Sequence, residues 1–408
     1  MSDYQREEDR FVGQRVRQIR ARRGISQQVL ADRAGMSRGA ISKYEIGERP
    51  IDSRRTLLAL ASALGVTMGE LTGYEHYRLD PSAVGFHASV PDIEVALWTQ
   101  GNATHAAPPR TLDQLTATAR HAAELRTACD YAALGPILAP LLTDCYRQIN
   151  DVHGAERDRA WDVLAMTAHT TAAALKARGY GALSWTAAQE AENAARNIGG
   201  TAASAATAFA RSQVLLSQPG SLPAALAHAE STAEKIAADV RTVGEIETYG
   251  MLHLQASLVT AILGGDPVPH LNEAAEQAGR LAEAELGTSI LRNPTFGPAN
   301  VQLWRMSAAM ERREPGEVLA LAPTLTPEEL PAQGRRAQYF VEIGRAHAQQ
   351  RNYRDSLHAL LRAEHAAPQH VRNMVHVREL VGHMMRRARR DLTTGDLGRL
   401  AQRVGVVA

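Results

Sequence analysis

Apolar residues recur at helical spacing through most of this chain of 408 residues. Between residues 10 and 22, Phe11, Val16 and Ile19 lie on one side of a helix whose other positions are mostly basic. From Leu112 onward one such pattern follows another, alanine is very frequent, and aromatic residues make up only 5% of the chain. The sequence therefore predicts an all-α protein.

Two short helices joined by a tight turn are predicted between Ser26 and Ile46. Ser26 suits the N-cap of the first helix, Gly35 suits the left-handed residue that ends it, and Ser37 can cap the second at once. Within the second helix, Ile41 points toward the core. This spacing is that of a helix-turn-helix.

The opposite face of the second helix carries residues suited to a DNA groove. They recur in pairs one turn apart and are Arg38, Gly39, Ser42 and Lys43. We expect Arg38, near the start of the helix, to read guanine, and Lys43 or Arg49 to contact phosphate. Gly39 costs about 1 kcal/mol of helix propensity.

The segment ISQQVLADRAGMSRGAISKYEIGERPI, followed by LLALASALGV, resembles the xenobiotic-response-element family of lambda-repressor-like DNA-binding domains over about the first seventy residues. The resemblance implies that Arg20 of the first helix pairs with Glu45 at the end of the recognition helix. The family usually carries a side chain where this sequence has Gly39. The DNA-binding residues predicted on these grounds are Gln27, Gln28, Ser37, Arg38, Gly39, Ser42, Lys43 and Arg49.

Two further helices complete a predicted five-helix head over residues 1–73. Asp52 or Ser53 caps the fourth helix. Thr67 and Glu70 form a capping-box pattern for a short fifth helix that ends near Gly73. Prolines then interrupt the pattern, so residues 74–111 are predicted to form a linker holding one short helix, DIEVALWTQ.

Residues 112–408 are predicted to form a tetratricopeptide-like body, an α-solenoid of helix pairs. One repeat near the C-terminus is clear, and its pattern residues are Phe340, Ile343, Gly344, His347, Tyr353, Ser356, Leu360, Ala363 and Pro368. Weaker patterns typical of second helices centre on Trp185, Leu226, Leu271 and Val318. Because one helix pair cannot bury its apolar face alone, such pairs stack into a superhelix with a concave surface.

Head and body together resemble helix-turn-helix regulators of actinobacteria with tetratricopeptide-like C-terminal domains, and more distantly the peptide-sensing quorum regulators of Gram-positive bacteria. The resemblance implies a ligand in the concave groove and a body that senses and dimerises. Its predicted ligand-binding residues are Arg292, Asn293, Asn300, Gln302, Arg305 and Asn373. The alternative for Asn300 is that it caps or braces a helix junction, and the alternative for Asn373 is a solvated capping helix.

Charge supports a DNA-binding head. The whole chain carries a formal net charge of +1, but residues 10 to 60 hold twelve Arg and Lys against four Asp and Glu, so the rest of the chain is acidic. That asymmetry attracts phosphates to one end of the molecule. Only three of the 45 basic residues are lysine, a bias typical of a GC-rich genome such as that of an actinobacterium.

Several other classes of function are not expected. Cys129 and Cys145 are too few for a disulfide framework. No apolar run approaches the length of a membrane span and the charged N-terminus does not suggest a signal peptide, so we expect a cytoplasmic protein. No spacing typical of a zinc site, phosphate loop or nucleophile elbow occurs, so we expect no metal, no cofactor and no enzyme activity.

These observations predict a sequence-specific transcriptional regulator that binds an inverted repeat as a homodimer. A peptide or small signalling molecule in the body is expected to tune it, and an extended peptide suits a concave groove best. Two alternatives stay open: an interaction scaffold localised on DNA by its head, and a repressor that needs no ligand.

Overall fold

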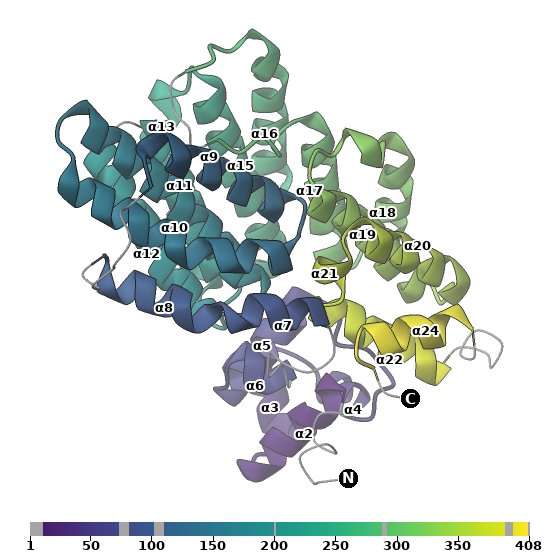
Figure 1. Cartoon of the computed structure of the whole chain (residues 1–408). Helices are drawn as coiled ribbons and strands as arrows, with labels where there is room; N and C mark the ends of the chain where they lie inside the picture. The colour runs from purple at the N-terminus through teal and green to yellow at the C-terminus, as the bar shows by residue number, and fades with distance from the viewer. Residues whose placement is uncertain are drawn as a thin grey trace.

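The computed structural model describes residues 11–72, 81–101, 110–199, 201–287, 292–387 and 395–406. Within these ranges the chain is built from helices, and the one β-bridge, between Thr242 and Glu285, is isolated (Figure 1). The prediction of an all-α protein is therefore confirmed. In the same ranges every helix is too short or too polar to cross a lipid bilayer.

Five short helices form the head. They are α2 (Val12–Arg22), α3 (Gln27–Ala34), α4 (Arg38–Glu45), α5 (Arg54–Leu64) and α6 (Met68–Thr72). Ser26, Ser37 and Ser53 cap α3, α4 and α5, each accepting a hydrogen bond from a backbone N–H three residues on. Gly35 ends α3 with φ of 64°, as predicted. The predicted end of the fifth helix, near Gly73, lies outside the described residues.

The head's core depends on a close approach of α2 to α4. A Cβ at Gly13 would lie 1.8 Å from the carbonyl oxygen of Tyr44, so only glycine allows this contact. Val16, Leu30 and Ile41 are fully buried beside it. Full burial of such a side chain contributes about 1.5 to 3 kcal/mol, and this apolar core fixes the orientation of α4.

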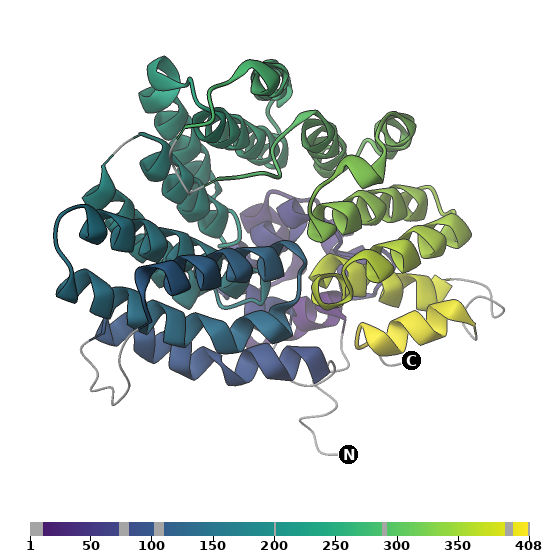
Figure 2. The same ribbon diagram turned by 45° about the horizontal axis from the view of Figure 1, so that its top comes forward.

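The body is a series of helix pairs that follow one another around an arc (Figure 2). The helices are α9 (Leu112–Thr127), α10 (Tyr131–Asp151), α11 (Ala155–Ala177), α12 (Gly181–Ile198), α13 (Thr201–Leu215), α14 (Leu222–Ile236), α15 (Val243–Leu263), α16 (Val268–Arg280), α17 (Pro298–Glu311), α18 (Pro315–Leu321), α19 (Gln333–Gln349) and α20 (Tyr353–Ala366). From α11 to α19, each first helix packs against the first helix of the next pair. The predicted helix-turn-helix head followed by a helical-repeat body is confirmed.

The weak sequence repeats mark second helices as predicted. Trp185, Leu226, Leu271 and Val318 lie on α12, α14, α16 and α18, each the second member of its pair. In the clear repeat, a Cβ on Gly344 of α19 would lie 3.1 Å from the Leu360 side chain of α20. Glycine therefore lets these two helices cross closely, which is why a small residue recurs at this position.

The segment predicted as a linker with one helix contains two. They are α7 (Pro81–Ala88) and α8 (Val90–Thr99), and both pack on α10. Pro91 was expected to interrupt the pattern but lies in the first turn of α8, where proline loses no hydrogen bond. Phe86 and Ile93 are buried in the body's core, so this segment is part of the packed body.

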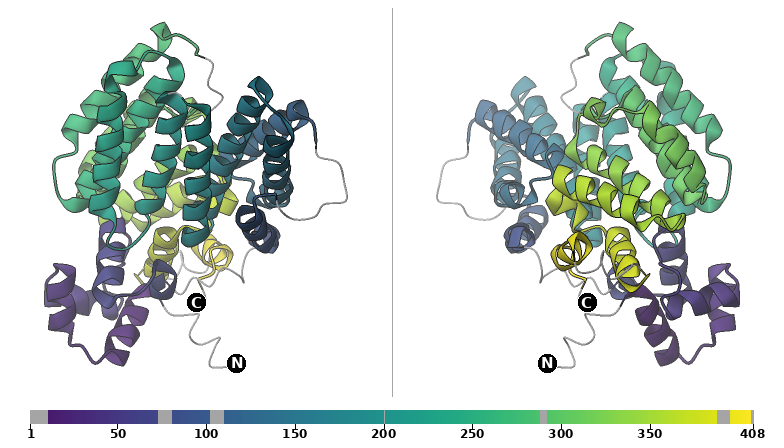
Figure 3. Two further views of the ribbon diagram at one scale, coloured as in Figure 1. Left: turned by 90° about the vertical axis from the view of Figure 1, so that its left-hand side faces the viewer. Right: turned by 90° about the vertical axis from the view of Figure 1, so that its right-hand side faces the viewer.

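The end of the solenoid returns to its beginning. After α20 come α21 (Pro368–Val371), α22 (Val375–Arg387) and α24 (Asp396–Arg403). Near α21, Nδ2 of Asn373 donates to the carbonyl of Ala177 at 2.8 Å, and the Gln369 carbonyl accepts from Arg178 at 2.9 Å. The head adjoins this closed end, beside the C-terminal helices, in both views of Figure 3.

Candidate nucleic-acid interface and its contacts with the body

The recognition helix α4 presents the predicted DNA-facing residues on one surface. Arg38, Gly39 and Lys43 are exposed and Ser42 is half-buried, whereas Ile41 is fully buried. A Cβ on Gly39 would meet nothing within 4 Å, so this position is open. Glycine leaves a gap here between Arg38 and Ser42, where a larger residue could reach a base.

The predicted pair of Arg20 and Glu45 anchors the end of α4. Arg20 donates to both carboxylate oxygens of Glu45, at 2.6 and 3.0 Å, and Glu45 is 2% exposed. The hydrogen bond to Glu45 raises the pKa of Arg20 above its ordinary value. Gln27 adds a third bond to the same carboxylate at 2.8 Å. Glu45 therefore holds α2, α3 and α4 together and has the structural role that the sequence predicted.

Three other residues predicted to contact DNA lie at the starts of helices and make hydrogen bonds within the head. The side-chain nitrogen of Gln27 is bonded to Glu45, which leaves its oxygen available. Gln28 is exposed and donates to Asp32 at 2.8 Å. The Ser37 hydroxyl caps α4. Their contacts with DNA stay predictions.

Arg49 lies at the boundary between head and body. It is half-buried, with its guanidinium carbon 5.4 Å from the centroid of the Tyr44 ring. Arg313 of the body donates to the Tyr44 hydroxyl at 3.2 Å. Both arginines line a cavity of about 330 Å³, whose walls are Ala34, Gly35, Met36, Ser37, Ala40, Tyr44, Arg49, Arg55, Thr56, Ala59 and Arg313. Arg49, a predicted phosphate contact, thus lies close to a side chain of the body.

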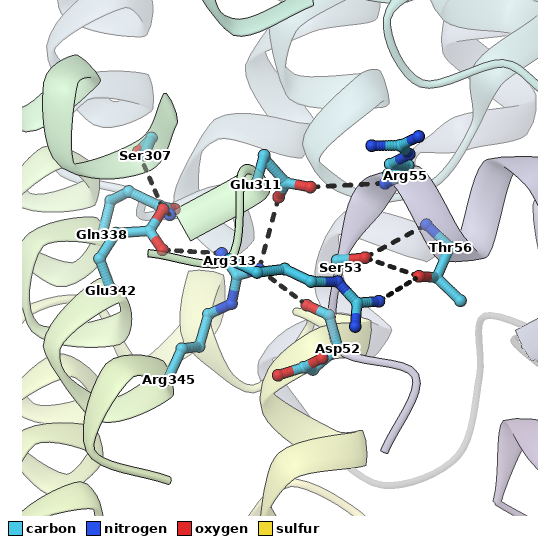
Figure 4. Close-up of polar contacts among 10 residues, drawn as sticks. All are labelled: Asp52, Ser53, Arg55, Thr56, Ser307, Glu311, Arg313, Gln338, Glu342 and Arg345. Atoms are coloured by element: carbon cyan, nitrogen blue, oxygen red, sulfur yellow. Dashed lines mark hydrogen bonds and ion pairs between the residues drawn. The ribbon is translucent and has the colours of Figure 1, made fainter. Parts of the chain in front are cut away.

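A buried polar network joins the head to the body, and we call it the junction network (Figure 4). At its centre, Arg345 of α19 donates to the backbone carbonyl of Asp52 at 3.0 Å and to Glu342 at 2.7 Å. Glu311 of α17 lies 3.4 Å from the same guanidinium and also accepts from the backbone N–H of Arg55 at 3.4 Å. Gln338 and Ser307 complete the bonds to Glu342.

Buried carboxylates compensate the charge of the arginine at the centre of the junction network. Arg345 is 2% exposed, and the side chains of Glu311 and Glu342 are fully buried. Burial alone would lower the pKa of Arg345, but Glu342, Glu311 and Asp52 raise it above its ordinary value. The guanidinium therefore stays charged, and losing it would strand two buried carboxylates.

A second contact ties the first helix of the head to α22. The carboxylate of Glu379 accepts a hydrogen bond from the backbone N–H of Val12 at 3.0 Å, at the start of α2. Burial raises the pKa of Glu379 to about 6. Nearby, Arg386 lies over the Phe11 ring at 4.5 Å, and Arg387 donates to the Glu48 carbonyl at 3.4 Å.

Sequence reasoning missed these junction contacts. Arg345 and Asp52 are 293 positions apart, and Val12 and Glu379 are 367 apart. Arg345 lies between Gly344 and Ala346 of α19, and no local motif distinguishes it from a solvated arginine. Only the fold brings these residues together.

The predicted ligand residues mostly brace the body. Arg292 makes two bonds of 2.8 Å to Glu247 of α15, and the backbone N–H of Asn293 donates to the same carboxylate at 2.8 Å. Arg305 donates to Asn272 at 3.2 Å, and Gln302 is half-buried. These contacts join α17 and its leading loop to α15 and α16.

Asn300 and Asn373 both brace the packing of helices in this structure, which for Asn300 is the alternative that the sequence left open. Asn300 is 1% exposed, and its Nδ2 donates to Sδ of Met251 on α15 at 3.4 Å. The prediction that it faces an open groove is therefore wrong, because helix packing covers it. Asn373 was predicted to bind ligand or to sit on a solvated helix, but it is bonded to the Ala177 carbonyl in the closure of the solenoid.

Neither cysteine is a reactive thiol, and the possible metal ligands of the described residues are not grouped into a site. Cys129 and Cys145 are both buried and unbridged. Burial raises the pKa of both thiols, that of Cys145 to about 12, so neither forms a reactive thiolate at neutral pH. In the part of the chain that the structure describes, no three His, Cys, Asp or Glu side chains are grouped as a metal site requires.

Comparisons with known proteins concern mainly the head. Residues 12–72 match the helix-turn-helix domain family. Over 70 residues the chain is 38% identical to the SPbeta prophage-derived uncharacterized HTH-type transcriptional regulator YonR of Bacillus subtilis (strain 168). This alignment covers 17% of this chain and 64% of YonR. The match thus spans slightly less than two thirds of that relative. Residues 12–72 are a helix-turn-helix domain.

Among solved structures, Bacillus thuringiensis PlcR in complex with the peptide PapR7 and DNA is similar with a TM-score of 0.31 and 11% identity. The alignment covers 66% of this chain and 95% of that one.

Proposed function

We propose that this protein is a sequence-specific DNA-binding transcriptional regulator. The observation that carries the proposal is the helix-turn-helix of residues 12–72, whose recognition helix exposes Arg38, Gly39 and Lys43 while Glu45 is anchored from behind. The basic charge of residues 10 to 60 favours binding to phosphate.

In this mechanism α4 enters the major groove with its N-terminal end foremost. Arg38, at the first position of the helix, reads the two acceptors of guanine, and Lys43 contacts phosphate at the other end. The apolar core and the Arg20 bond to Glu45 hold α4 rigid, so the side chains are positioned before DNA arrives.

The protein acts as a homodimer on an inverted repeat. One head of this size reads few bases, and a two-fold pair that reads half-sites about 10 bp apart, or a multiple of that distance, doubles the contact. Light scattering of the DNA complex tests this proposal. A monomer on an asymmetric site at working concentration would contradict it.

The body regulates the head through a bound ligand, a peptide or small signalling molecule. The observation that favours regulation is the junction network, because a buried set of charges has few alternative arrangements and can transmit a shift of α17 or α19 to Asp52. A ligand changes DNA affinity by no more than its preference between the two arrangements.

The decisive experiment is selection of bound duplexes from a random DNA pool by the full chain, followed by affinity measurements on the enriched sequence. The Arg38→Ala variant should enrich a site that is relaxed at one base position, and the matched surface variant Arg354→Ala should behave as wild type, because Arg354 is exposed on α20. Failure of the wild type to enrich any sequence would refute the proposed function. A tight protein partner that competes for the body would favour the scaffold alternative.

A further inference from the structure

Four cationic side chains from distant helices form a cluster between head and body, which we call the cationic cluster. Arg54 is the first residue of α5 in the head, Arg126 and Lys176 lie in the last turns of α9 and α11, and Arg335 lies in the first turn of α19. The contact that places α19 beside α9 is at Gly334, where a Cβ would lie 3.0 Å from Sγ of Cys129.

The members of the cationic cluster act on one another electrostatically. Burial, then Arg54 and Arg335, lower the pKa of Lys176 to about 7. Burial, then Arg126 and Arg54, lower the pKa of Arg335 to about 10. Each shift is toward the neutral form, so the positive charges repel in the absence of a counter-charge.

No carboxylate neutralises the cationic cluster among the residues that the structure describes. Lys176 donates to the neutral amide of Gln213 at 2.6 Å, and Arg335 lies over the Trp304 ring at 5.3 Å. The guanidiniums of Arg54 and Arg126 have no hydrogen-bond or ion-pair partner in the same ranges, and Nε of Arg126 is completely buried. A charge that is partly removed from water and has no partner of opposite charge is destabilising.

Neutral donors and a fifth arginine surround the cationic cluster. Nδ1 of His370 lies 3.2 Å from the Tyr131 hydroxyl, and the Arg178 guanidinium lies over the Tyr131 ring at 5.4 Å. Burial, then Arg335, Arg178 and Lys176, lower the pKa of His370 to about 4, so this imidazole is neutral at pH 7. All four members of the cluster are half-buried, which leaves part of each reachable from solvent.

We propose that the cationic cluster binds a small polyanion, a phosphate ester or a di- or tricarboxylate, which bridges the head through Arg54 and the body through Arg126, Lys176 and Arg335. At least two negative charges are needed, because one would leave the four cations largely uncompensated. The inference deepens the proposed ligand regulation and rests on it.

The position of Arg54 explains how a polyanion would reach the DNA-binding surface. Arg54 follows Ser53, the cap of α5, and Asp52, whose carbonyl is held by Arg345. An anion that draws Arg54 toward α11 and α19 stabilises one arrangement of α5 against the body. Helix α5 packs on α3 of the helix-turn-helix, so the reading surface moves with it.

The test is thermal melting of the full chain with inorganic pyrophosphate or citrate, each compared with sodium chloride at equal ionic strength. Either anion should raise the melting temperature by several degrees when its concentration is about a hundred times its Kd. Response to pyrophosphate alone assigns the site to phosphate esters, and response to citrate alone assigns it to carboxylates.

Two variants decide whether the cationic cluster is the site. Arg126→Met loses no hydrogen bond and relieves repulsion, so its melting temperature without anion should be unchanged or higher while the response to anion is lost. Arg54→Met serves the same purpose if Arg126→Met does not fold. The control, Arg354→Gln, should respond as wild type.

Absence of any response beyond that to sodium chloride would overturn the proposal, as would an equal response in Arg126→Met and wild type. DNA affinity is measured separately. A response that depends on the cationic cluster, in a protein that binds no DNA, supports the anion site and refutes the proposed function instead.

Discussion

Two of the three arginines of α19 lie in opposite electrostatic settings. Arg345 is 2% exposed and faces Glu311 and Glu342 in the junction network. Arg335, ten positions earlier, faces Arg126 and Arg54 with no carboxylate among the described residues. The pKa of Arg345 is raised by its carboxylate partners, and that of Arg335 is lowered by burial and by neighbouring cations. The difference separates a charge that the fold satisfies from one that a ligand has to satisfy.

The largest loss of stability should come from removing Arg345, the arginine whose charge is compensated by buried carboxylates. Arg345→Met strands the buried carboxylates of Glu311 and Glu342 and should lower the free energy of unfolding by about 3 to 5 kcal/mol. Urea denaturation of the full chain measures this, with the exposed Arg354→Met as control, expected within about 0.5 kcal/mol of wild type. A loss below about 1 kcal/mol would show that the network is not compensated as described.

A smaller loss is expected at the other compensated pair. Arg20→Ala leaves Glu45 buried with Gln27 as its remaining side-chain donor, and should destabilise the head by about 2 to 3 kcal/mol. Thermal melting of the full chain measures this, with the transition monitored by a spectroscopic probe placed within the head. An unchanged melting transition there would refute the pairing.

An exposed, uncompensated cation should affect binding and leave stability alone. Arg38→Ala should weaken specific DNA binding by about 1 to 3 kcal/mol and relax one base position. Lys43→Ala, a phosphate contact at the other end of α4, should weaken all sequences alike. Equal loss on specific and random DNA for Arg38→Ala would contradict its role, and its melting temperature should match that of wild type.

Glu379 is a buried acid whose raised pKa makes the stability of the folded protein depend on pH. Burial raises its pKa to about 6, against the opposing effects of the Val12 N–H, Arg386 and Arg378, while Asp52 raises it further. Because the folded-state pKa exceeds the usual 4.5, the group's contribution to stability is fully present below about pH 4.5 and is lost as the pH rises through about 6. The loss is at most about 2 kcal/mol.

Glu379→Gln should therefore lack this part of the pH dependence. Unfolding free energies of variant and wild type, measured from pH 4.5 to 7.5, should diverge on the alkaline side, with the variant more stable there. Parallel profiles would mean that Glu379 titrates normally.

Local interactions explain why much of the fold could be predicted. The caps Ser26 and Ser37, the left-handed Gly35 and the capping box of Thr67 with Glu70 act within a few residues, and each is found as expected. Pro91 was misread because proline breaks a helix interior but starts a helix equally well. The sequence left two interpretations open for Asn300 because a short amide is equally suited to a groove and to a helix junction, and the fold buries it at a junction.

The sequence by itself determined the helices, their caps, the helix-turn-helix and the second helices of the repeats, because hydrophobic period and capping are properties of short segments. The tertiary structure alone decided where charges meet. Arg345 donates to the carbonyl of Asp52 although 293 positions separate them, and Asn373 donates to the carbonyl of Ala177, 196 positions away. Arg54 approaches Lys176 because the solenoid closes beside the head. Whether a buried arginine is compensated depends on such distant neighbours, and no local pattern encodes them.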